Sequence, residues 1–143
     1  MICVTASKFI CLIARKSYMI YLPAVILTVG ISVLSLTEST HMPSVSLNDK
    51  AIHGLFYTLL AMSWLVPTVK QGSKNSNFQT FKHCVVICVA TTAYGALLEL
   101  LQHYCTLTRS GEWLDVLADF LGALIGVLIV FVISKSRHHD ISN

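Results

Sequence analysis

Three groups of polar side chains stand one helical turn apart inside apolar segments: Asp49 with His53, Glu99 with Gln102 and His103, and Asp115 with Asp119. Residues three or four apart share one face of an α-helix. Carboxylates and imidazoles on one face can move a proton, bind a cation or hold a polar ligand. Lys50 and Arg109 are the cations nearest to these acids in the sequence.

Each of these residues also fits a plain structural role. Asp49 and Lys50 suit the start of a helix, where an acid interacts favourably with the helix dipole. His53 and His103 fit imidazoles at a membrane interface, and a Glu99–Arg109 or Glu99–Lys50 pair would hold helices together. The Asp49–His53 and Glu99–His103 pairs lack the Glu-x-x-His spacing of carboxylate-bridged bundles, so we predict no metal and no cofactor.

The composition excludes an ordinary soluble domain. The 143 residues are 55% hydrophobic and 12% charged, with a mean hydropathy of +0.70, whereas soluble domains are about 25% charged. The apolar residues form four blocks of nearly bilayer-spanning length, at about 18–36, 51–69, 84–103 and 113–133. We therefore predict an all-α, polytopic four-helix transmembrane bundle over 18–133, flanked by cytoplasmic segments at 1–17 and 134–143.

The basic residues predict the orientation. Eight of the ten Lys and Arg residues flank one side, and only Lys50 and Arg109 flank the other. Basic residues favour the cytoplasmic side, so both termini should be cytoplasmic in a bacterial inner membrane. The block at 18–36 is too long for a signal peptide, so we expect an uncleaved helix. The net charge of +3 then reflects topology, and no nucleic-acid partner is expected.

Small residues recur every fourth position on the last apolar block, at Ala118, Gly122 and Gly126. Such a row lets helix backbones approach closely in a membrane. We expect it to serve packing within the bundle first and homo-oligomerisation second. The five cysteines have no paired or zinc-type spacing, so we interpret them as small apolar fillers.

Three segments taken together resemble the VanZ-like family. They are Asp49-Lys50 with His53, then Glu99 with Gln102, then Arg109 followed by Asp115, Asp119, Gly122 and Gly126. The resemblance covers about residues 47–130 and implies a small multi-pass bacterial membrane protein. Asp119 stands where Asn is frequent in the family, which adds a negative charge. The site residues carried over by the resemblance are Asp49, Lys50, His53, Tyr57, Glu99, Gln102, Arg109, Asp115, Asp119, Gly122 and Gly126.

The family's namesake is associated with low-level resistance to the glycopeptide teicoplanin. We therefore expect non-enzymatic binding or shielding of a lipid-linked envelope molecule or lipoglycopeptide at the outer leaflet. One alternative is an intramembrane enzyme acting on a lipid headgroup, with His53 or Glu99 as general base and Arg109 and Lys50 binding phosphate. The other is a proton- or ion-coupled transporter that uses the same acids.

Overall fold

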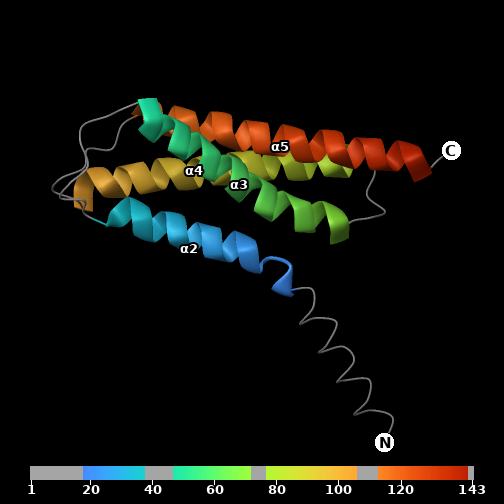
Figure 1. The fold of residues 1–143 in the computed structure, drawn as a ribbon, viewed down its shortest axis with the longest axis horizontal. Helices are drawn as coiled ribbons and strands as arrows, with labels where there is room; N and C mark the ends of the chain where they lie inside the picture. Colours follow the sequence, from blue (N-terminus) through green and yellow to red (C-terminus); the bar gives the residue numbers. More distant parts are fainter. Residues whose placement is uncertain (1–17, 38–46, 72–76, 106–112, 142–143) are drawn as a thin grey trace, which may run out of the picture.

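Four α-helices, each antiparallel to the next, make up the described part of the chain (Figure 1). The computed structural model describes residues 18–37, 47–71, 77–105 and 113–141, and these contain no strand. The helices are α2 (Leu22–Leu36), α3 (Leu47–Gln71), α4 (Asn77–Cys105) and α5 (Trp113–Ile141). The predicted all-α four-helix bundle is confirmed. The predicted N-terminal segment 1–17 lies outside the described residues.

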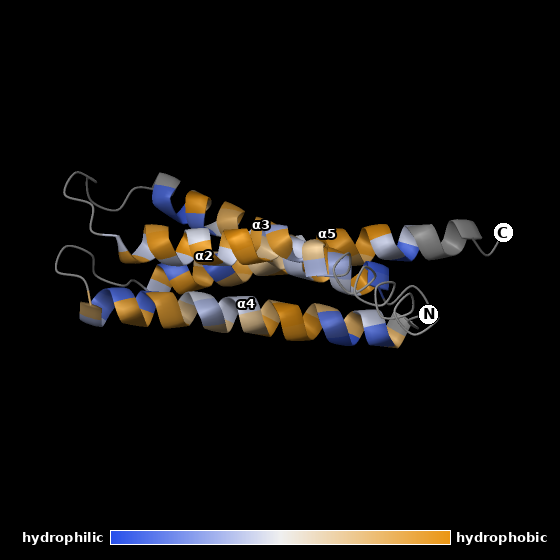
Figure 2. Cartoon of the chain, turned by 90° about the horizontal axis from the view of Figure 1, so that it is seen from below, coloured by the Kyte–Doolittle hydropathy of each residue, from blue (hydrophilic) through white to orange (hydrophobic). Residues whose placement is uncertain are grey.

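Three of these helices are long and apolar enough to cross a membrane. Their apolar stretches are Asp49–Gln71, Phe78–Cys105 and Trp113–Ser136, of 23, 28 and 24 residues. At about 1.5 Å per residue each exceeds the ~30 Å of hydrocarbon. Figure 2 shows the pattern, with hydrophobic residues along the middle of the bundle and hydrophilic ones concentrated toward its ends.

Several helix boundaries differ from the apolar blocks that predicted them. Helix α3 starts at Leu47 and α4 at Asn77, ahead of the blocks at 51 and 84, and two further differences lie toward the ends of the chain. The first block begins at Tyr18, but α2, with 15 residues, starts at Leu22 after a turn at Tyr18–Tyr21. Pro23 lies in its first turn, a position that suits proline because no helical partner for its missing N–H is needed there. At the other end, α5 continues past Ile133 to Ile141. Residues 134–141 contain neither Gly nor Pro, so nothing local stops the helix.

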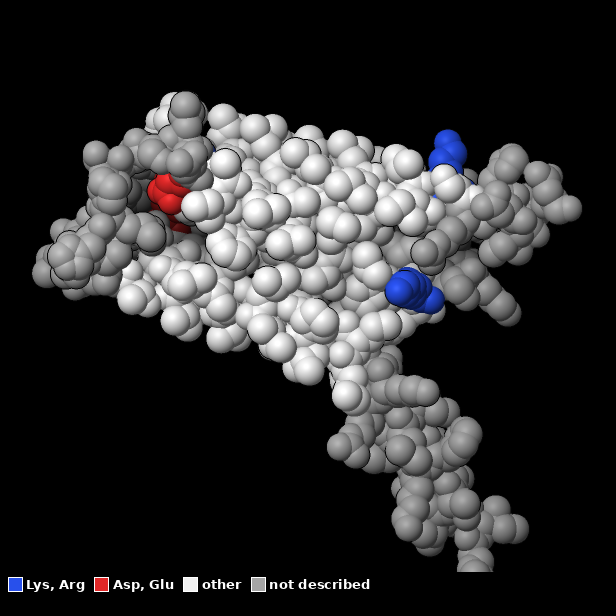
Figure 3. Space-filling view, in the orientation of Figure 1, with Lys and Arg blue, Asp and Glu red and all other residues white. Residues whose placement is uncertain are grey.

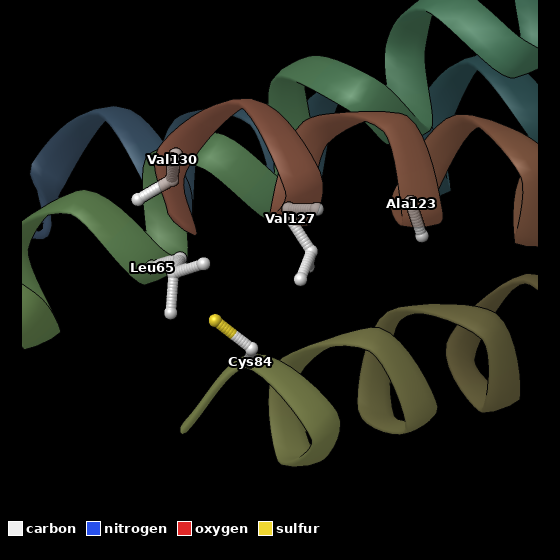
Figure 4. Packing of buried hydrophobic residues seen from close by; sticks show 6 residues of the cluster. Leu65, Cys84, Ala123, Val127 and Val130 are labelled. Atoms are coloured by element: carbon white, nitrogen blue, oxygen red, sulfur yellow. The ribbon is translucent and has the colours of Figure 1, made fainter. Parts of the chain in front are cut away.

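Two apolar clusters fill the interior. One contains Leu65 of α3, Cys84 of α4 and Val127 of α5, together with Ala61, Ala123 and Val130 (Figure 4). The other joins Ile31 of α2 to Tyr57, Leu60 and Leu98. Cys84 is a free thiol in the first cluster, as expected for a small apolar filler. These clusters place α4 against the α3–α5 pair.

Glycines allow α3 and α5 to touch through their backbones. A Cβ added to Gly122 would collide with the backbone of Gly54, and one added to Gly126 would lie 2.5 Å from the Thr58 carbonyl oxygen. The Thr58 hydroxyl is shared between the carbonyls of Gly54, at 2.8 Å, and Gly122, at 2.9 Å. Gly122 and Gly126 of the predicted small-residue row therefore do face a helix within the bundle. Ala118 extends the contact, because its carbonyl lies 3.6 Å from a Cβ placed on Gly54.

Hydroxyl groups and one amide attach α2 to its neighbours. The Tyr94 hydroxyl of α4 donates to the Thr28 carbonyl at 2.7 Å and lies 2.6 Å from the Ser32 hydroxyl. The Gln102 amide donates to the Ser35 carbonyl at 2.8 Å. Between helices in lipid, where apolar burial gives little driving force, such bonds help to hold the elements together.

Apart from Lys50, the charged residues with described side chains separate by sign to opposite ends of the bundle. Asp49, Glu99, Asp115 and Asp119, all the acids with described side chains, lie where α3 and α5 begin and α4 ends. Lys70, Lys82 and Lys135 lie near the other ends of these helices. In Figure 3 acidic atoms show at the left end of the molecule and basic atoms toward the right end. We call the two ends of the bundle the acidic end and the basic end.

Candidate functional site

Residues from three helices form one polar cluster at the acidic end. The first turns of α3 contribute Asp49, Lys50 and His53, the last turns of α4 contribute Glu99, and the first turns of α5 contribute Asp115 and Asp119. Because consecutive helices are antiparallel, a start of α3, an end of α4 and a start of α5 meet at the same depth. Helical spacing places Asp49 with His53 and Asp115 with Asp119 on common faces, and the packing of the helices brings these faces together.

Lys50 and Asp115 form an ion pair between α3 and α5. The Lys50 Nζ donates to the Asp115 Oδ1 at 2.8 Å, and the two side chains are 22% and 11% exposed. The sequence suggested Glu99 as a partner of Lys50, whereas in the structure Lys50 forms its ion pair with Asp115. The pair ties the first turns of the two helices together just above the glycine contact.

His53 is the centre of the cluster. Its Nδ1 lies 3.1 Å from the Asp119 Oδ1, within hydrogen-bond distance, and 4.0 Å from the Glu99 Oε1. Asp49 and Asp115 also lie close to His53. One carboxylate oxygen of each and one His53 ring nitrogen all lie within 4.8 Å of one another. Four acids from three helices thus surround one imidazole.

Asp119 is the most deeply buried member, with 1% of its side chain exposed. Its Oδ1 meets His53, and its Oδ2 has no hydrogen-bond partner. The Oδ2 faces Gly95 of α4, because a Cβ added at Gly95 would collide with it and would lie 3.0 Å from the Tyr57 hydroxyl. Gly95 therefore makes the space into which Asp119 and Tyr57 project.

Sequence reasoning did not select Gly95 as a site residue. Its position four residues before Glu99, on the same helix face, was the available signal. Only the packing of α5 against α4 shows that the missing side chain matters, because the Asp119 carboxylate occupies that space.

Several predicted site residues lie elsewhere or cannot be placed. Gln102 is buried, but its amide is bonded to α2 and serves helix attachment. His103 is exposed, and its ring lies edge-on to Tyr104 with centroids 5.2 Å apart. His103 is therefore not a member of the cluster, and it does not join Glu99 as the carboxylate–imidazole pair weighed in the sequence analysis. Arg109 lies outside the described residues.

A groove of about 520 Å³ runs along the seam between α3 and α5 and ends at Lys50. Its walls are mainly apolar, with Ala51 and Leu55 on α3 and Leu114, Leu117 and Leu121 on α5. Several of these side chains are also largely exposed, with Leu55 at 60% and Leu121 at 49%. The groove therefore opens toward the lipid. Its volume is within the ~300–1,000 Å³ typical of small-molecule sites.

The arrangement combines two chemical environments. The groove offers apolar contact along α3 and α5, and the cluster offers carboxylates, an imidazole and an ammonium at the acidic end. Such a combination can hold an amphiphilic molecule, with its apolar chain in the groove and its polar part at the cluster. Buried acids in a membrane segment are costly and usually mark function.

Comparison with known proteins assigns the family. No curated protein and no solved structure matches the chain. A model of the VanZ/LLP1 family matches residues 48–134, which is more than half of the chain and includes nearly all of the described α3–α5 unit. The polar cluster and the glycine contact both fall within this match. The chain therefore belongs to the VanZ/LLP1 family.

Proposed function

We propose that the protein binds an amphiphilic molecule at the outer leaflet of a bacterial inner membrane, without chemically changing it. The ligand class is a lipid-linked envelope molecule or a lipoglycopeptide. An acyl chain occupies the α3–α5 groove, and the polar part contacts Lys50 and the acids around it. The role is to bind or shield such a molecule.

One observation carries the proposal: the apolar groove ends at the side chain that begins the polar cluster. Lys50 lines the groove and is paired with Asp115. A single molecule can therefore bury a chain in the groove and place a hydrogen-bonding group at Lys50 or Asp115. Ligand sites commonly combine apolar walls with a few placed polar groups.

The test blocks the groove without touching the core. Ala51 is exposed and lines the groove, so Ala51→Trp should fill it. Val86 of α4 is 61% exposed and lies outside the groove lining, so Val86→Trp is the matched control. We expect nanodisc-embedded wild type and Val86→Trp to bind teicoplanin, the probe suggested by the family's namesake, and Ala51→Trp to lose at least tenfold in affinity, about 1.4 kcal/mol.

Cells expressing each variant provide the second readout. Teicoplanin susceptibility should be reduced by wild type and Val86→Trp at equal membrane abundance, and not by Ala51→Trp. Equal binding of teicoplanin by the two tryptophan variants would show that the groove is not the binding site. Failure of the wild type to bind teicoplanin would refute the glycopeptide ligand, and copurified lipids identified by mass spectrometry then decide whether a lipid-linked ligand takes its place.

An intramembrane enzyme is the alternative that the same acids allow. His53 or Glu99 would act as general base on a lipid headgroup, with Lys50 and Arg109 binding its phosphate. The two functions differ in what happens to the ligand. Binding leaves a lipid intact over hours in the presence of protein, whereas catalysis releases its headgroup at a rate that replacing the general base, by His53→Gln or Glu99→Gln, would abolish.

A further inference from the structure

Three helices each direct one metal-ligating side chain toward the same point. His53 comes from α3, Glu99 from α4 and Asp119 from α5, and one ligand atom of each lies within 4.8 Å of the others. None of the three is a neighbour of another in the sequence. The convergence is therefore produced by the bundle and not by a short acidic run.

The spacing of these atoms suits coordination of a single ion. The His53 Nδ1 is 3.1 Å from the Asp119 Oδ1 and 4.0 Å from the Glu99 Oε1. Metal–ligand bonds of about 2.0–2.2 Å place neighbouring ligand atoms roughly 3.0–3.6 Å apart. One separation falls in this range, and the other exceeds it by less than the movement available to a Glu side chain.

The burial of Asp119 is an independent indication of a ligand. Its side chain is 1% exposed, and its Oδ2, which lies near the Tyr57 hydroxyl, accepts no hydrogen bond of regular geometry. A buried carboxylate oxygen without a partner is costly, and the cost is larger in a membrane segment. A cation bound by this carboxylate would supply the missing interaction.

The charge of the cluster agrees with a cation. The proposed site itself contributes two carboxylates, those of Glu99 and Asp119, beside the imidazole of His53. Two negative groups held so close together attract a cation.

We propose that His53, Glu99 and Asp119 bind a divalent transition-metal ion that links α3, α4 and α5. One imidazole and two carboxylates are a donor set that zinc accepts, with a fourth position left for water or for a group of a bound ligand. This site is separate from the groove, whose lining includes none of the three residues. It can therefore be tested independently of the proposed ligand.

Zn²⁺ is the probe, used on tag-free protein in detergent. Wild type should retain one equivalent after dialysis, measured by elemental mass spectrometry, and Zn²⁺ should raise its unfolding temperature. Asp119→Asn and Glu99→Gln, which preserve side-chain shape, should each lose the equivalent and the stabilisation. EDTA should lower the unfolding temperature of the wild type and leave that of the two variants unchanged.

Two control variants examine the competing zinc ligands. Cys88→Ala removes a thiol of α4 near the basic end, and Asp49→Asn removes an acid of the neighbouring Asp49–His53–Asp115 group. Both should keep the bound Zn²⁺. Loss in either control, with retention in Asp119→Asn, would place the ion elsewhere and overturn the assignment. Wild type without bound Zn²⁺ would overturn it directly, whatever the variants do, and would leave the hydrogen bond between His53 Nδ1 and Asp119 Oδ1 as the link between α3 and α5 at this point.

Discussion

At the scale of single residues, the Lys50–Asp115 ion pair lets two oppositely charged side chains lie largely buried at the acidic end. Both side chains are largely buried, at 22% and 11% exposure. In such surroundings an ion pair adds little net stability, but removing Lys50 alone leaves the buried Asp115 carboxylate without its ion-pair partner. The pair should therefore show its importance only when one member is removed alone.

A double-mutant cycle measures this coupling. Lys50→Met should destabilise the protein by about 1–3 kcal/mol because the Asp115 carboxylate loses its donor. Lys50→Met combined with Asp115→Asn should be closer to wild type, with a coupling energy of roughly 0.5–3 kcal/mol. The measurement is the free energy of unfolding in mixed micelles titrated with SDS.

Lys70→Met is the matched control, because Lys70 is exposed at the basic end. Its effect should stay within about 0.5 kcal/mol. Strictly additive effects of the Lys50 and Asp115 substitutions would show that the two charges are not coupled.

The sequence predicted the membership of the cluster better than its pairings. Helical spacing places Asp49 with His53 and Asp115 with Asp119 on common faces, and the structure keeps those faces inward. The spacing cannot say which residue meets which across helices, because that depends on how each helix is rotated about its axis. For this reason Lys50 meets Asp115 and not Glu99, and His103 turns outward.

At the scale of elements, one contact between glycines determines how close α3 and α5 lie. Gly122 has the Gly54 backbone where its side chain would be, and backbone cannot move aside as a flexible side chain could. In contrast, a Cβ on Gly30 of α2 would meet nothing within 4 Å. The two glycines thus form a matched pair for the same substitution.

Gly122→Ala should destabilise the bundle by roughly 1–3 kcal/mol, the usual cost of overpacking. Gly30→Ala should be neutral or stabilising by about 0.5–1 kcal/mol, since alanine favours the helix. Unfolding in mixed micelles measures both. Equal stability of the two alanine variants would show that α3 and α5 do not touch at Gly122.

The row of small residues was visible in the sequence, but its partner was not. Ala118, Gly122 and Gly126 predicted a close approach on α5, and nothing in the spacing identified α3 as the helix approached. Gly54 is the single glycine on α3, and Thr58, four residues later, is the small residue that follows it on the same face. Only the crossing of the two helices gives Gly54 a role.

At the scale of the whole molecule, the separation of charge predicts its orientation. Basic side chains favour the cytoplasm, so we propose that the basic end is cytoplasmic and the acidic end faces outward. The structure supports a membrane bundle with this polarity along its axis, and the side on which each end lies is open to direct measurement.

Thiol labelling in intact cells tests the orientation. Cys105 is a native, exposed cysteine at the acidic end, so an impermeant thiol reagent should label it from outside. With the native cysteines replaced, a cysteine introduced by Gln71→Cys, exposed at the basic end, should react only after the cells are permeabilised. The reverse pattern would invert the topology and place the polar cluster in the cytoplasmic leaflet.

The two ends of the bundle also differ in what resists their separation. At the acidic end, α3 and α5 are joined by an ion pair, and the His53–Asp119 bond is added to it. Toward the basic end, among the residues that the structure describes, Leu65, Cys84, Val127 and Val130 pack through apolar contacts, which lipid chains can replace at little cost. When the surrounding lipid is stretched or thinned, the helices should therefore separate first at the basic end, while α3 and α5 stay joined at the acidic end.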